Sequence, residues 1–277
     1  MPTRCRPLLG TFVEITVAPE AASAIDAAFG AIARVQALMS FHAADSDLAR
    51  IRVAQPGECI EIAPETCEVL RIASELHRAS NGLFDVTVGR ELVRGGFLPR
   101  PARGPFRGPF GWPFRGERGA TMADIELLEG NRVRCTRPVL IDLGGIAKGY
   151  AVDQAIAALR AAGACEGLVN AGGDMRLFGP RRWPVGLRDA DGRVRTTIEL
   201  ADCAIASSAN LGNRHRRWGR RVTPHIGFGR KPILCKERVS VIAPRCVIAD
   251  AMTKIAMADR ALAGRLLAPH GGQVLAD

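Results

Sequence analysis

Two short segments of the chain combine paired glycines with charged side chains, a combination that suits a phosphate-bearing ligand. In the first segment, Asp142 precedes the pair Gly144-Gly145, and Lys148 follows three residues later. In the second, the pair Gly172-Gly173 is followed directly by Asp174. Glycines let the backbone approach a ligand closely, and the N–H groups at a helix start bind anions. Tight turns alone would also explain the glycine pairs, but the charges of Asp142 and Lys148 favour a binding site.

Regular elements on both sides should hold these segments in place. The apolar run 139–141 predicts a buried strand, the alanine-rich segment 150–162 predicts a helix closed by Gly163, and 167–170 predicts the next strand. Further strands are expected at 10–18, 58–62, 204–208, 239–243 and 273–275, and hairpins at 122–135 and 183–200. Helices are expected at 21–39, 64–80, 249–257 and 258–268, and Ser46 should cap a further short helix. Because strands and helices mix without strict alternation, the pattern predicts an α+β fold.

Size and composition indicate a globular protein with an anionic partner. The 277 residues suffice for one large domain or two lobes, and the formal net charge of +10 favours anionic ligands. The eight cysteines stand singly, without metal-ligand spacing, which predicts buried thiols in a reducing compartment. We find neither a secretory leader nor an apolar run of the ~20 residues that a membrane span needs. The expected location is therefore the cytoplasm, or the periplasm only if a leader is missing.

Two arginine-rich tracts leave a nucleic-acid hypothesis open. Residues 94–119 are Gly, Pro, Arg and Phe without a period, which predicts a flexible insertion, and residues 214–221 read RHRRWGRR. Arginines interleaved with aromatic residues can bind single-stranded nucleic acid. No motif of a nucleic-acid-binding fold accompanies them, so we consider this partner unlikely.

For His42 and Asp85, the sequence pattern favours a structural or surface role over a ligand contact. A lone histidine such as His42 is more often a surface loop residue than a ligand. Asp85 stands in an apolar run, where a carboxylate needs partners, so the pattern favours a structural hydrogen-bond hub over a ligand contact. The chain lacks a P-loop, a dinucleotide-binding fingerprint and a GxSxG nucleophile elbow.

Six segments, in order along the chain, resemble the motifs of the ApbE-like flavin transferase family. They are LGT at 9–11, MSFHAADSDLAR at 39–50, GLFDVTVG at 82–89, DLGGIAKGY at 142–150, NAGGD at 170–174 and VIAPRCVIADA at 241–251. The resemblance covers nearly the whole chain, 1–277, as a single domain. It implies an α+β, ApbE-like fold with mixed or antiparallel sheets, packed helices and two lobes around a central FAD cleft.

The resemblance also implies an activity and a site. Members of the family move FMN from FAD to a threonine or serine hydroxyl of an acceptor flavoprotein and release AMP. The positions implied to bind FAD are Leu9, His42, Leu83, Phe84, Asp85, Asp142 and Lys148. Those implied to hold Mg²⁺ are the Gly145 carbonyl, Asp250 and a hydroxyl one turn later, here Thr253. His225 matches the family's histidine that would take the proton of the acceptor hydroxyl.

The chain departs from the family pattern at two places. The family's HIIDPxTG motif reads HIGFGRK at 225–231, and Lys254 stands where the family has a metal-ligating threonine, with Thr253 one position early. An ammonium cannot ligate Mg²⁺, so Lys254 either weakens the metal site or stands in for the ion by pairing with Asp250 or the pyrophosphate. A flavin-binding relative that does not transfer, or a slow FAD pyrophosphatase, is therefore the alternative function. We expect the diphosphate to lie where the Asp142 turn meets the helix of Asp250.

Overall fold

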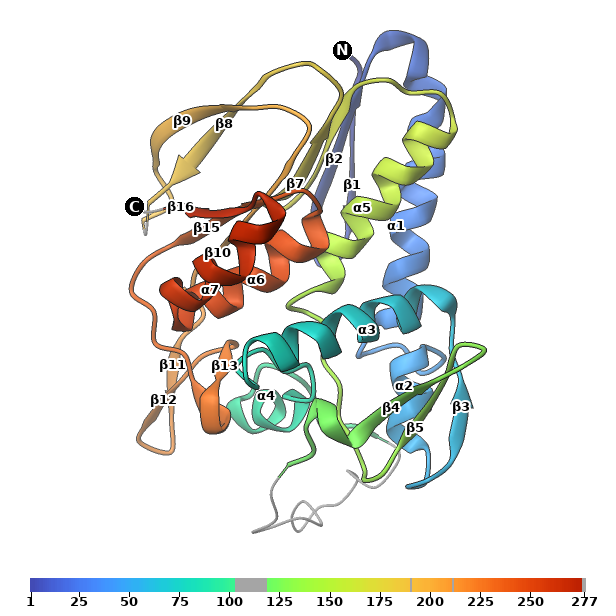
Figure 1. Cartoon of the computed structure of the whole chain (residues 1–277), viewed down its shortest axis with the longest axis vertical. Helices are drawn as coiled ribbons and strands as arrows, with labels where there is room; N and C mark the ends of the chain where they lie inside the picture. Colours follow the sequence, from blue (N-terminus) through green and yellow to red (C-terminus); the bar gives the residue numbers. More distant parts are fainter. Residues whose placement is uncertain (103–118, 190, 211, 276–277) are drawn as a thin grey trace. The chain divides into compact units, whose positions relative to one another are not determined.

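The computed structural model describes residues 1–102, 119–189, 191–210 and 212–275, which divide into two compact units (Figure 1). The first unit comprises residues 1–36, 144–212 and 234–277, and the second comprises 37–143 and 213–233. The insertion predicted at 94–119 lies mostly outside the described residues, which are interrupted at 103–118.

A seven-stranded antiparallel sheet forms the centre of the first unit. In spatial order its strands are β1 (Thr3–Leu8), β2 (Thr11–Val17), β6 (Gly167–Ala171), β7 (Asp174–Phe178), β10 (Ala204–Ser208), β15 (Val239–Ala243) and β16 (Gln273–Leu275). Leu9 and Gly10 connect β1 to β2 with φ angles of 55° and 72°. Two positive φ angles in a two-residue loop are typical of a type I′ turn, whose twist matches that of the paired strands.

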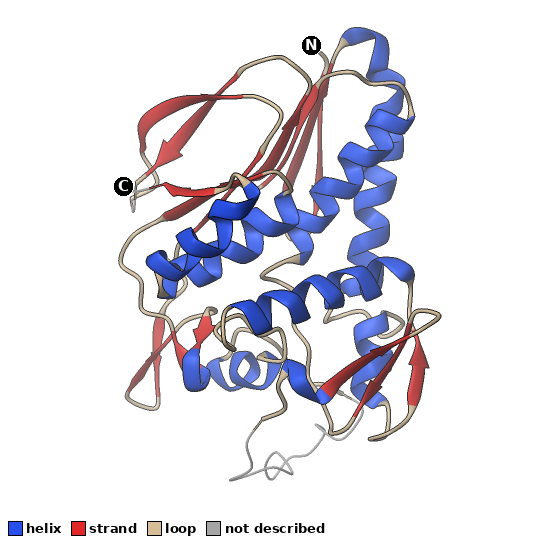
Figure 2. Ribbon diagram, viewed as in Figure 1, coloured by secondary structure: helices blue, strands red, loops and turns tan. Residues whose placement is uncertain are grey.

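Helices pack on this sheet, as Figure 2 shows. They are α5 (Ala147–Ala161), α6 (Cys246–Ala258) and α7 (Arg260–Leu267), and the 3₁₀ turn η1 (Pro19–Ala24) leads into α1 (Ile25–Met39). A short 3₁₀ turn, η4 (Ala268–His270), follows α7. The buried face of α5 carries Tyr150, Ile156 and Leu159, all at most 1% exposed. Gly163 follows the end of α5 with a φ of 86°, as its predicted role as a helix stop requires.

A separate hairpin packs on the sheet away from α6 and α7 (Figure 1). It consists of β8 (Trp183–Arg188) and β9 (Val194–Leu200). An apolar cluster that includes Val185 of the hairpin and Leu177, Ile205 and Ile242 of the sheet joins the two layers. The first unit is therefore a central sheet with helices on one face and a hairpin on the other.

The described residues of the second unit form three helices, a small sheet and two hairpins. The helices are α2 (Asp47–Val53), α3 (Pro64–Ala79) and α4 (Gly89–Gly95), and the 3₁₀ turns are η2 (Met122–Asp124) and η3 (Phe228–Arg230). The sheet has the order β3 (Cys59–Glu61), β5 (Arg132–Cys135), β4 (Ile125–Leu128), and the hairpins pair β11 (His215–Arg217) with β12 (Arg220–Val222) and β13 (Ile226–Gly227) with β14 (Lys231–Pro232).

Local capping explains where two of these helices begin. The Ser46 hydroxyl accepts the Ala49 N–H at 3.1 Å, which confirms Ser46 as the N-cap of α2. Asp47 is 4% exposed, and its Oδ2 accepts the Thr66 hydroxyl at 2.6 Å and the Ala63 N–H at 3.0 Å. This carboxylate therefore ties the start of α3 to α2.

Three predicted elements differ from the structure. The run Val139, Leu140 and Ile141 is buried but is not a strand, because its backbone makes isolated bonds to the 86–89 segment instead of a ladder: the Leu140 carbonyl accepts the Gly89 N–H at 3.0 Å. The helix predicted at 249–257 begins at Cys246, so Asp250 lies in its second turn. The insertion was predicted to start at Arg94, but Arg94 belongs to α4, a helix that the pattern did not predict.

The structure also tests the prediction that the cysteine thiols are buried. All eight cysteines are free, but only Cys67, Cys135 and Cys246 are buried, so the expectation of buried thiols is wrong for the others.

Among the described residues, one helical stretch, Pro19–Met39, is long and apolar enough to cross a membrane. Core helices of globular proteins pass the same test, and Phe29 and Ile32 in this stretch are at most 1% exposed.

Candidate functional site

Four charged side chains of alternating sign form one cluster in the first unit. Lys148 is the second residue of α5, Asp174 the first residue of β7, and Asp250 and Lys254 lie one turn apart on α6. The Lys148 ammonium is hydrogen-bonded to Asp174 Oδ2 and lies 3.6 Å from Asp250 Oδ2. The Lys254 ammonium donates to Asp250 Oδ1 at 2.7 Å. The structure thus brings both glycine-pair segments together with the predicted Asp250 helix.

A close approach of α5 to α6 sets this geometry. The Gly149 N–H donates to Asp250 Oδ2 at 3.1 Å. A Cβ on Gly149 would lie 2.6 Å from the Cys246 carbonyl carbon and 2.8 Å from the Asp250 Cβ, far inside van der Waals contact. Only glycine therefore lets the backbone of α5 reach the Asp250 carboxylate.

A second carboxylate, Asp153, fixes the start of α6 against α5. Its Oδ1 and Oδ2 accept the N–H groups of Cys246 and Val247, each at 3.0 Å, and Oδ1 also pairs with Arg176 at 2.6 Å. Free N–H groups at a helix start attract a carboxylate, so Asp153 serves as a cap supplied from another helix. Sequence reasoning missed this residue, because nothing near 153 in the sequence marks it as a capping position for 246–247.

The charges of the cluster shift one another's pKa values. Burial by itself would raise the pKa of Asp250, but Lys148 and Lys254 lower it to about 2. Burial and the negative charge of Asp250 raise the pKa of Asp174. Burial opposes the charged form of Lys148, yet Asp250 and Asp174 together raise its pKa. Near neutral pH, Asp250 is therefore an anion and Lys148 a cation.

The cations lie on the accessible side of the cluster. The side chains of Lys148 and Lys254 are 32% and 15% exposed, whereas those of Asp174 and Asp250 are 3% and 0% exposed. A ligand that approaches this surface meets two ammonium groups before it meets the carboxylates behind them. The arrangement therefore favours an anion such as a phosphate.

The oxygen atoms of this cluster do not form a coordination site for Mg²⁺. Mg²⁺ takes oxygen ligands at ~2.0–2.1 Å in near-octahedral geometry. Here the Lys254 ammonium already contacts Asp250 Oδ1, the Asp250 carbonyl at 3.2 Å, Ser208 Oγ at 2.9 Å and Thr253 Oγ1 at 3.0 Å. Thr253 itself donates to the Asp250 carbonyl at 2.7 Å. Gly145 lies in the turn before α5, and among the described residues no three His, Cys, Asp or Glu side chains gather in a metal-binding group.

A second polar group lies in the second unit around Asp85. Its Oδ1 accepts the Thr87 hydroxyl at 2.7 Å and the Thr87 N–H at 2.8 Å, and its Oδ2 pairs with Arg230 at 3.2 Å. His77 Nδ1 lies 3.7 Å from the same Oδ2. Asp85 is thus the hydrogen-bond hub that the apolar run predicted, and whether it also contacts FAD stays a prediction.

Arg230 ties the altered HIGFGRK loop to this hub. Its Nη2 donates to Thr87 Oγ1 at 2.8 Å and to the Ala120 carbonyl, and its Nη1 lies 3.6 Å from Glu91 Oε2. Burial raises the pKa of Glu91, and Arg230 opposes that shift. Sequence reasoning noted the loss of the family's residues in this loop but not this arginine, whose partners are more than a hundred residues away in the chain.

A cavity of about 310 Å³ adjoins the hub in the second unit. Asp85, His77 and Arg230 line it, together with backbone of Gly82 and Gly227. His225 is the first residue of the HIGFGRK loop, and its carbonyl accepts the Ile233 N–H at 2.8 Å. The cavity offers both cationic and anionic groups to a polar ligand.

The remaining predicted positions fall in both units. Leu83 and Phe84 are buried, at 3% and 5% exposed, and His42 is exposed on a loop beside Phe41. The Asp142 N–H donates to the Val86 carbonyl at 2.8 Å, which places Asp142 next to the 82–89 motif in the second unit. Leu9 belongs to the first unit, where its N–H donates to Gln36 Oε1 at 2.6 Å. The joint FAD site of these residues stays a prediction.

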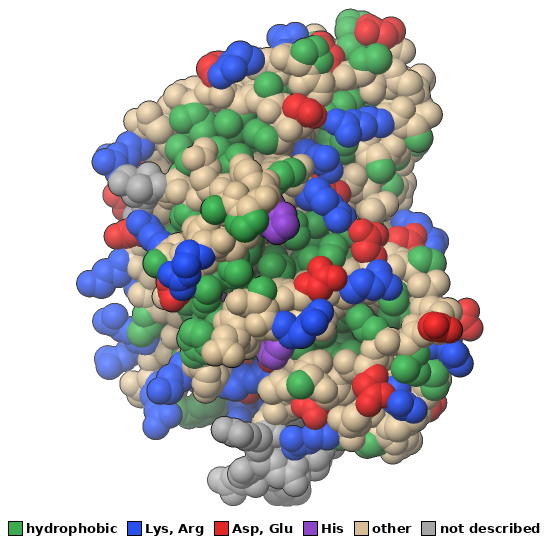
Figure 3. Space-filling model, in the orientation of Figure 1, with side chains coloured by type: hydrophobic (Ala, Val, Ile, Leu, Met, Phe, Trp, Pro, Cys, Tyr) green, Lys and Arg blue, Asp and Glu red, His purple; other side chains and the backbone are tan. Residues whose placement is uncertain are grey.

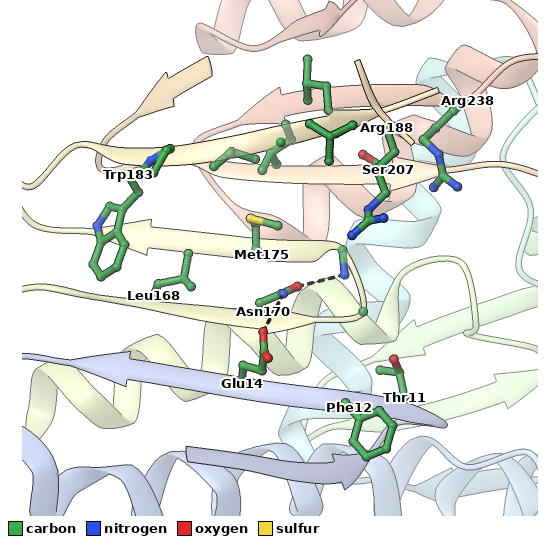
Figure 4. Close-up of a pocket in the computed structure, with 18 residues that line it drawn as sticks. Thr11, Phe12, Glu14, Leu168, Asn170, Met175, Trp183, Arg188, Ser207 and Arg238 are labelled. Atoms are coloured by element: carbon green, nitrogen blue, oxygen red, sulfur yellow. Dashed lines mark hydrogen bonds between the residues drawn. The ribbon is translucent and has the colours of Figure 1, made fainter. Parts of the chain in front are cut away.

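A cavity of about 620 Å³ in the first unit lies between the sheet and the β8–β9 hairpin (Figure 4). Leu168, Met175 and Trp183 form its apolar part. Figure 4 shows the side chains of Arg188 and Arg238 near the end of β6, where the Gly173 N–H donates to Asn170 Oδ1 at 2.9 Å. This cavity suits a ligand with an apolar body and an anionic end.

Arginine side chains gather over the β11–β12 hairpin, as Figure 3 shows at the lower left. Arg216, Arg220 and Arg221 are exposed, and Trp218 at the turn is 77% exposed. Most of the 214–221 tract is therefore exposed, with Arg214 and Arg217 half-buried.

Comparison with known proteins gives one consistent result. The model of the ApbE family matches residues 9–275. A protein of Vibrio cholerae serotype O1 named FAD:protein FMN transferase is 31% identical over 227 residues, which cover 77% of this chain and 66% of that protein. A Haemophilus influenzae protein of the same name is 28% identical over 240 residues, which cover 79% of this chain and 67% of that protein. The chain thus spans about two thirds of the length of these relatives.

Solved structures agree over nearly the whole chain. The crystal structure of an ApbE protein from Thermotoga maritima superposes with a TM-score of 0.84 at 27% identity and covers 99% of this chain and 93% of that chain. The flavin transferase ApbE from Vibrio cholerae gives a TM-score of 0.74 at 25% identity, with 99% and 92% covered. The predicted α+β fold is confirmed.

Proposed function

Because the chain belongs to the ApbE family, we propose that it transfers FMN from FAD to a threonine or serine hydroxyl of another protein. In this reaction the hydroxyl oxygen forms a bond to the phosphorus of the FMN half of FAD. The bond from that phosphorus to the bridging oxygen breaks, AMP leaves with that oxygen, and the hydroxyl proton passes to a base. The acceptor is therefore a flavoprotein with an accessible threonine or serine.

The observation that carries the proposal is the cation-faced cluster of Lys148 and Lys254. Phosphoryl transfer requires groups that position the phosphates and neutralise the charge that develops on the leaving oxygen. Lys148 is held in place by Asp174 and Asp250, so its ammonium is oriented before any ligand arrives. We assign to it the binding of the FAD pyrophosphate.

The base in the proposed reaction is His225. A histidine imidazole is a common general base that can accept a hydroxyl proton. The neighbouring loop is anchored by Arg230 to Asp85, which supports a fixed position for the histidine backbone. Leu9, His42, Leu83, Phe84, Asp85 and Asp142 complete the proposed flavin site.

Mg²⁺ is implied by the family but takes no part in this proposal. Its expected ligands, Gly145, Asp250 and Thr253, do not offer a free carboxylate, because Lys254 holds Asp250 Oδ1.

The alternative is a flavin-binding relative that does not transfer FMN. Two observations favour it: Lys254 at the metal position, and the HIGFGRK loop, which lacks the family's DP and TG residues. Such a protein would bind FAD, or hydrolyse it slowly to FMN and AMP, without labelling an acceptor. A nucleic-acid binder that uses the β11–β12 arginines has less support, since no motif of such a fold accompanies them.

A transfer assay separates these functions. The full chain is incubated with FAD and a threonine-containing acceptor domain, and covalent flavin is measured by in-gel fluorescence and mass spectrometry while AMP is measured by chromatography. Transfer predicts labelled acceptor and AMP in equal amounts, and the alternative predicts AMP or bound FAD without label. His225→Ala should abolish label but leave FAD binding unchanged, whereas Lys148→Ala should weaken FAD binding.

A further inference from the structure

The Lys254 ammonium occupies a shell of oxygen atoms that resembles a cation site. Asp250 Oδ1, Ser208 Oγ, Thr253 Oγ1 and the Asp250 carbonyl lie 2.7, 2.9, 3.0 and 3.2 Å from its Nζ. Ser208 and Thr253 are buried and hydrogen-bonded to each other at 2.7 Å. An ammonium has three hydrogens and no acceptor capacity, so a pocket made only of oxygens suits it well.

This shell is built into the fold and does not depend on a flexible surface contact. Asp250 is fully buried, and its second oxygen is held by the Gly149 N–H and lies near Lys148. Ser208 ends strand β10, and Thr253 belongs to α6, so two packed elements supply the oxygens. The Lys254 side chain is only 15% exposed.

A divalent ion would have to share this shell with the ammonium. Both would need the same Asp250 oxygen, and both are cations, so each disfavours the other. The other carboxylate of the cluster, Asp174, is already paired with Lys148. One positive charge therefore already fills the place where a metal ion would bind.

We propose that the Lys254 ammonium is the resident cation of this site and that the chain binds the pyrophosphate of FAD without a divalent metal. The inference rests on the proposed function for the identity of its ligand. Lys148 and Lys254 face the ligand side, and the two carboxylates behind them hold both ammonium groups in place. Lys254 then supplies the positive charge that a metal ion would supply, and it attracts the pyrophosphate electrostatically, because its N–H groups are already donated to protein oxygens.

The test measures metal and flavin binding separately. The full-length protein is stripped with EDTA and titrated with Mn²⁺, whose free concentration is followed by its electron paramagnetic resonance signal. FAD binding is measured by flavin fluorescence with excess EDTA and with excess Mg²⁺. Lys254→Thr is compared with Lys236→Thr, the same substitution at an exposed lysine of the same unit.

The wild type and Lys236→Thr should bind no Mn²⁺ at the site, and their FAD affinity should be equal in EDTA and in Mg²⁺. In Lys254→Thr, FAD affinity in EDTA should fall by about 10- to 100-fold, as expected for the loss of one positive charge beside the pyrophosphate. Mg²⁺ should restore that affinity, and one Mn²⁺ should bind, because the substitution releases Asp250 and adds a hydroxyl.

Two results of the binding measurements would overturn the inference. One is stoichiometric Mn²⁺ binding by the wild type together with FAD affinity that is lost in EDTA, a measurement that needs no variant to fold. The other is unchanged FAD affinity of a folded Lys254→Thr protein in EDTA. Failure of the proposed function looks different: metal-independent FAD binding that requires Lys254, with no label on any acceptor. Label that forms only with Mg²⁺ would keep the function and refute the inference.

Discussion

Replacement of Gly149 by alanine should separate α5 from α6 and disturb the charged cluster. The new Cβ would meet the carbonyl carbon of Cys246 at 2.6 Å and the Cβ of Asp250 at 2.8 Å. These neighbours are backbone or the first atom of a side chain, so they cannot rotate away. The helices must move apart, and the hydrogen bond from the Gly149 N–H to Asp250 Oδ2, now 3.1 Å, must lengthen.

Three contributions set the size of the effect. Alanine in a helix interior is favoured over glycine by about 1 kcal/mol. Overpacking of a tight contact costs about 1–3 kcal/mol. Loss of a hydrogen bond to a buried carboxylate costs about 1.5–3 kcal/mol. Since the two penalties exceed the gain, we expect Gly149→Ala to lower the free energy of unfolding by roughly 2–4 kcal/mol.

The assay is urea unfolding followed by circular dichroism, with Gly30→Ala as the matched control. Gly30 lies within α1, and a Cβ there would have no atom within 4 Å outside its own helix neighbourhood. The control should therefore gain up to about 1 kcal/mol, because only helix propensity changes. Equal stabilisation by both substitutions would refute the close approach of α5 and α6.

Three further predictions concern single contacts. Asp153→Asn should lower the unfolding free energy by about 2–4 kcal/mol in urea titrations, because Arg176 and the start of α6 lose a buried carboxylate; an unchanged midpoint would contradict this. Arg230→Ala should lower the free energy of unfolding by about 2–3 kcal/mol and speed amide hydrogen exchange at residues 83–88, because Asp85 loses its cationic partner. Unaltered exchange would contradict the role of Asp85 as a hydrogen-bond hub. The pKa of Asp250 is lowered from 3.8 to about 2, so its stabilisation is present above pH ~4 and lost as the pH falls toward 2. The wild type should lose about 2 kcal/mol over that range relative to Asp250→Asn, and parallel pH profiles would contradict the assignment.

Much of the fold was predictable because local patterns and tertiary packing agree. The hairpins at 122–135 and 183–200 have strong turn signals between alternating strands, and Ser46 has the side chain that a helix N-cap needs. The run 139–141 was misassigned because a short apolar run looks the same whether or not a partner strand exists. The start of α6 was placed late because its cap, Asp153, comes from another helix.

The proximity of the two glycine-pair segments was predictable, but most contacts of the cluster were not. Lys148 and Asp174, one from each segment, form an ion pair in the structure, whereas the FAD-binding roles of Asp142 and Lys148 stay predictions. Sequence spacing did not reveal Ser208 as an oxygen partner of Lys254, because β10 and α6 are distant in the chain. The contact of Arg230 with Asp85 was not predicted for the same reason. Long-range polar contacts depend on packing, which periodicity does not encode.

The most direct measurement of the central claim is the amount of AMP released per covalently bound flavin when the chain is given FAD and a threonine-containing acceptor. We expect one AMP for each flavin on the acceptor, in EDTA as well as in Mg²⁺. AMP without labelled acceptor, under every condition, would contradict the assignment of FMN transfer.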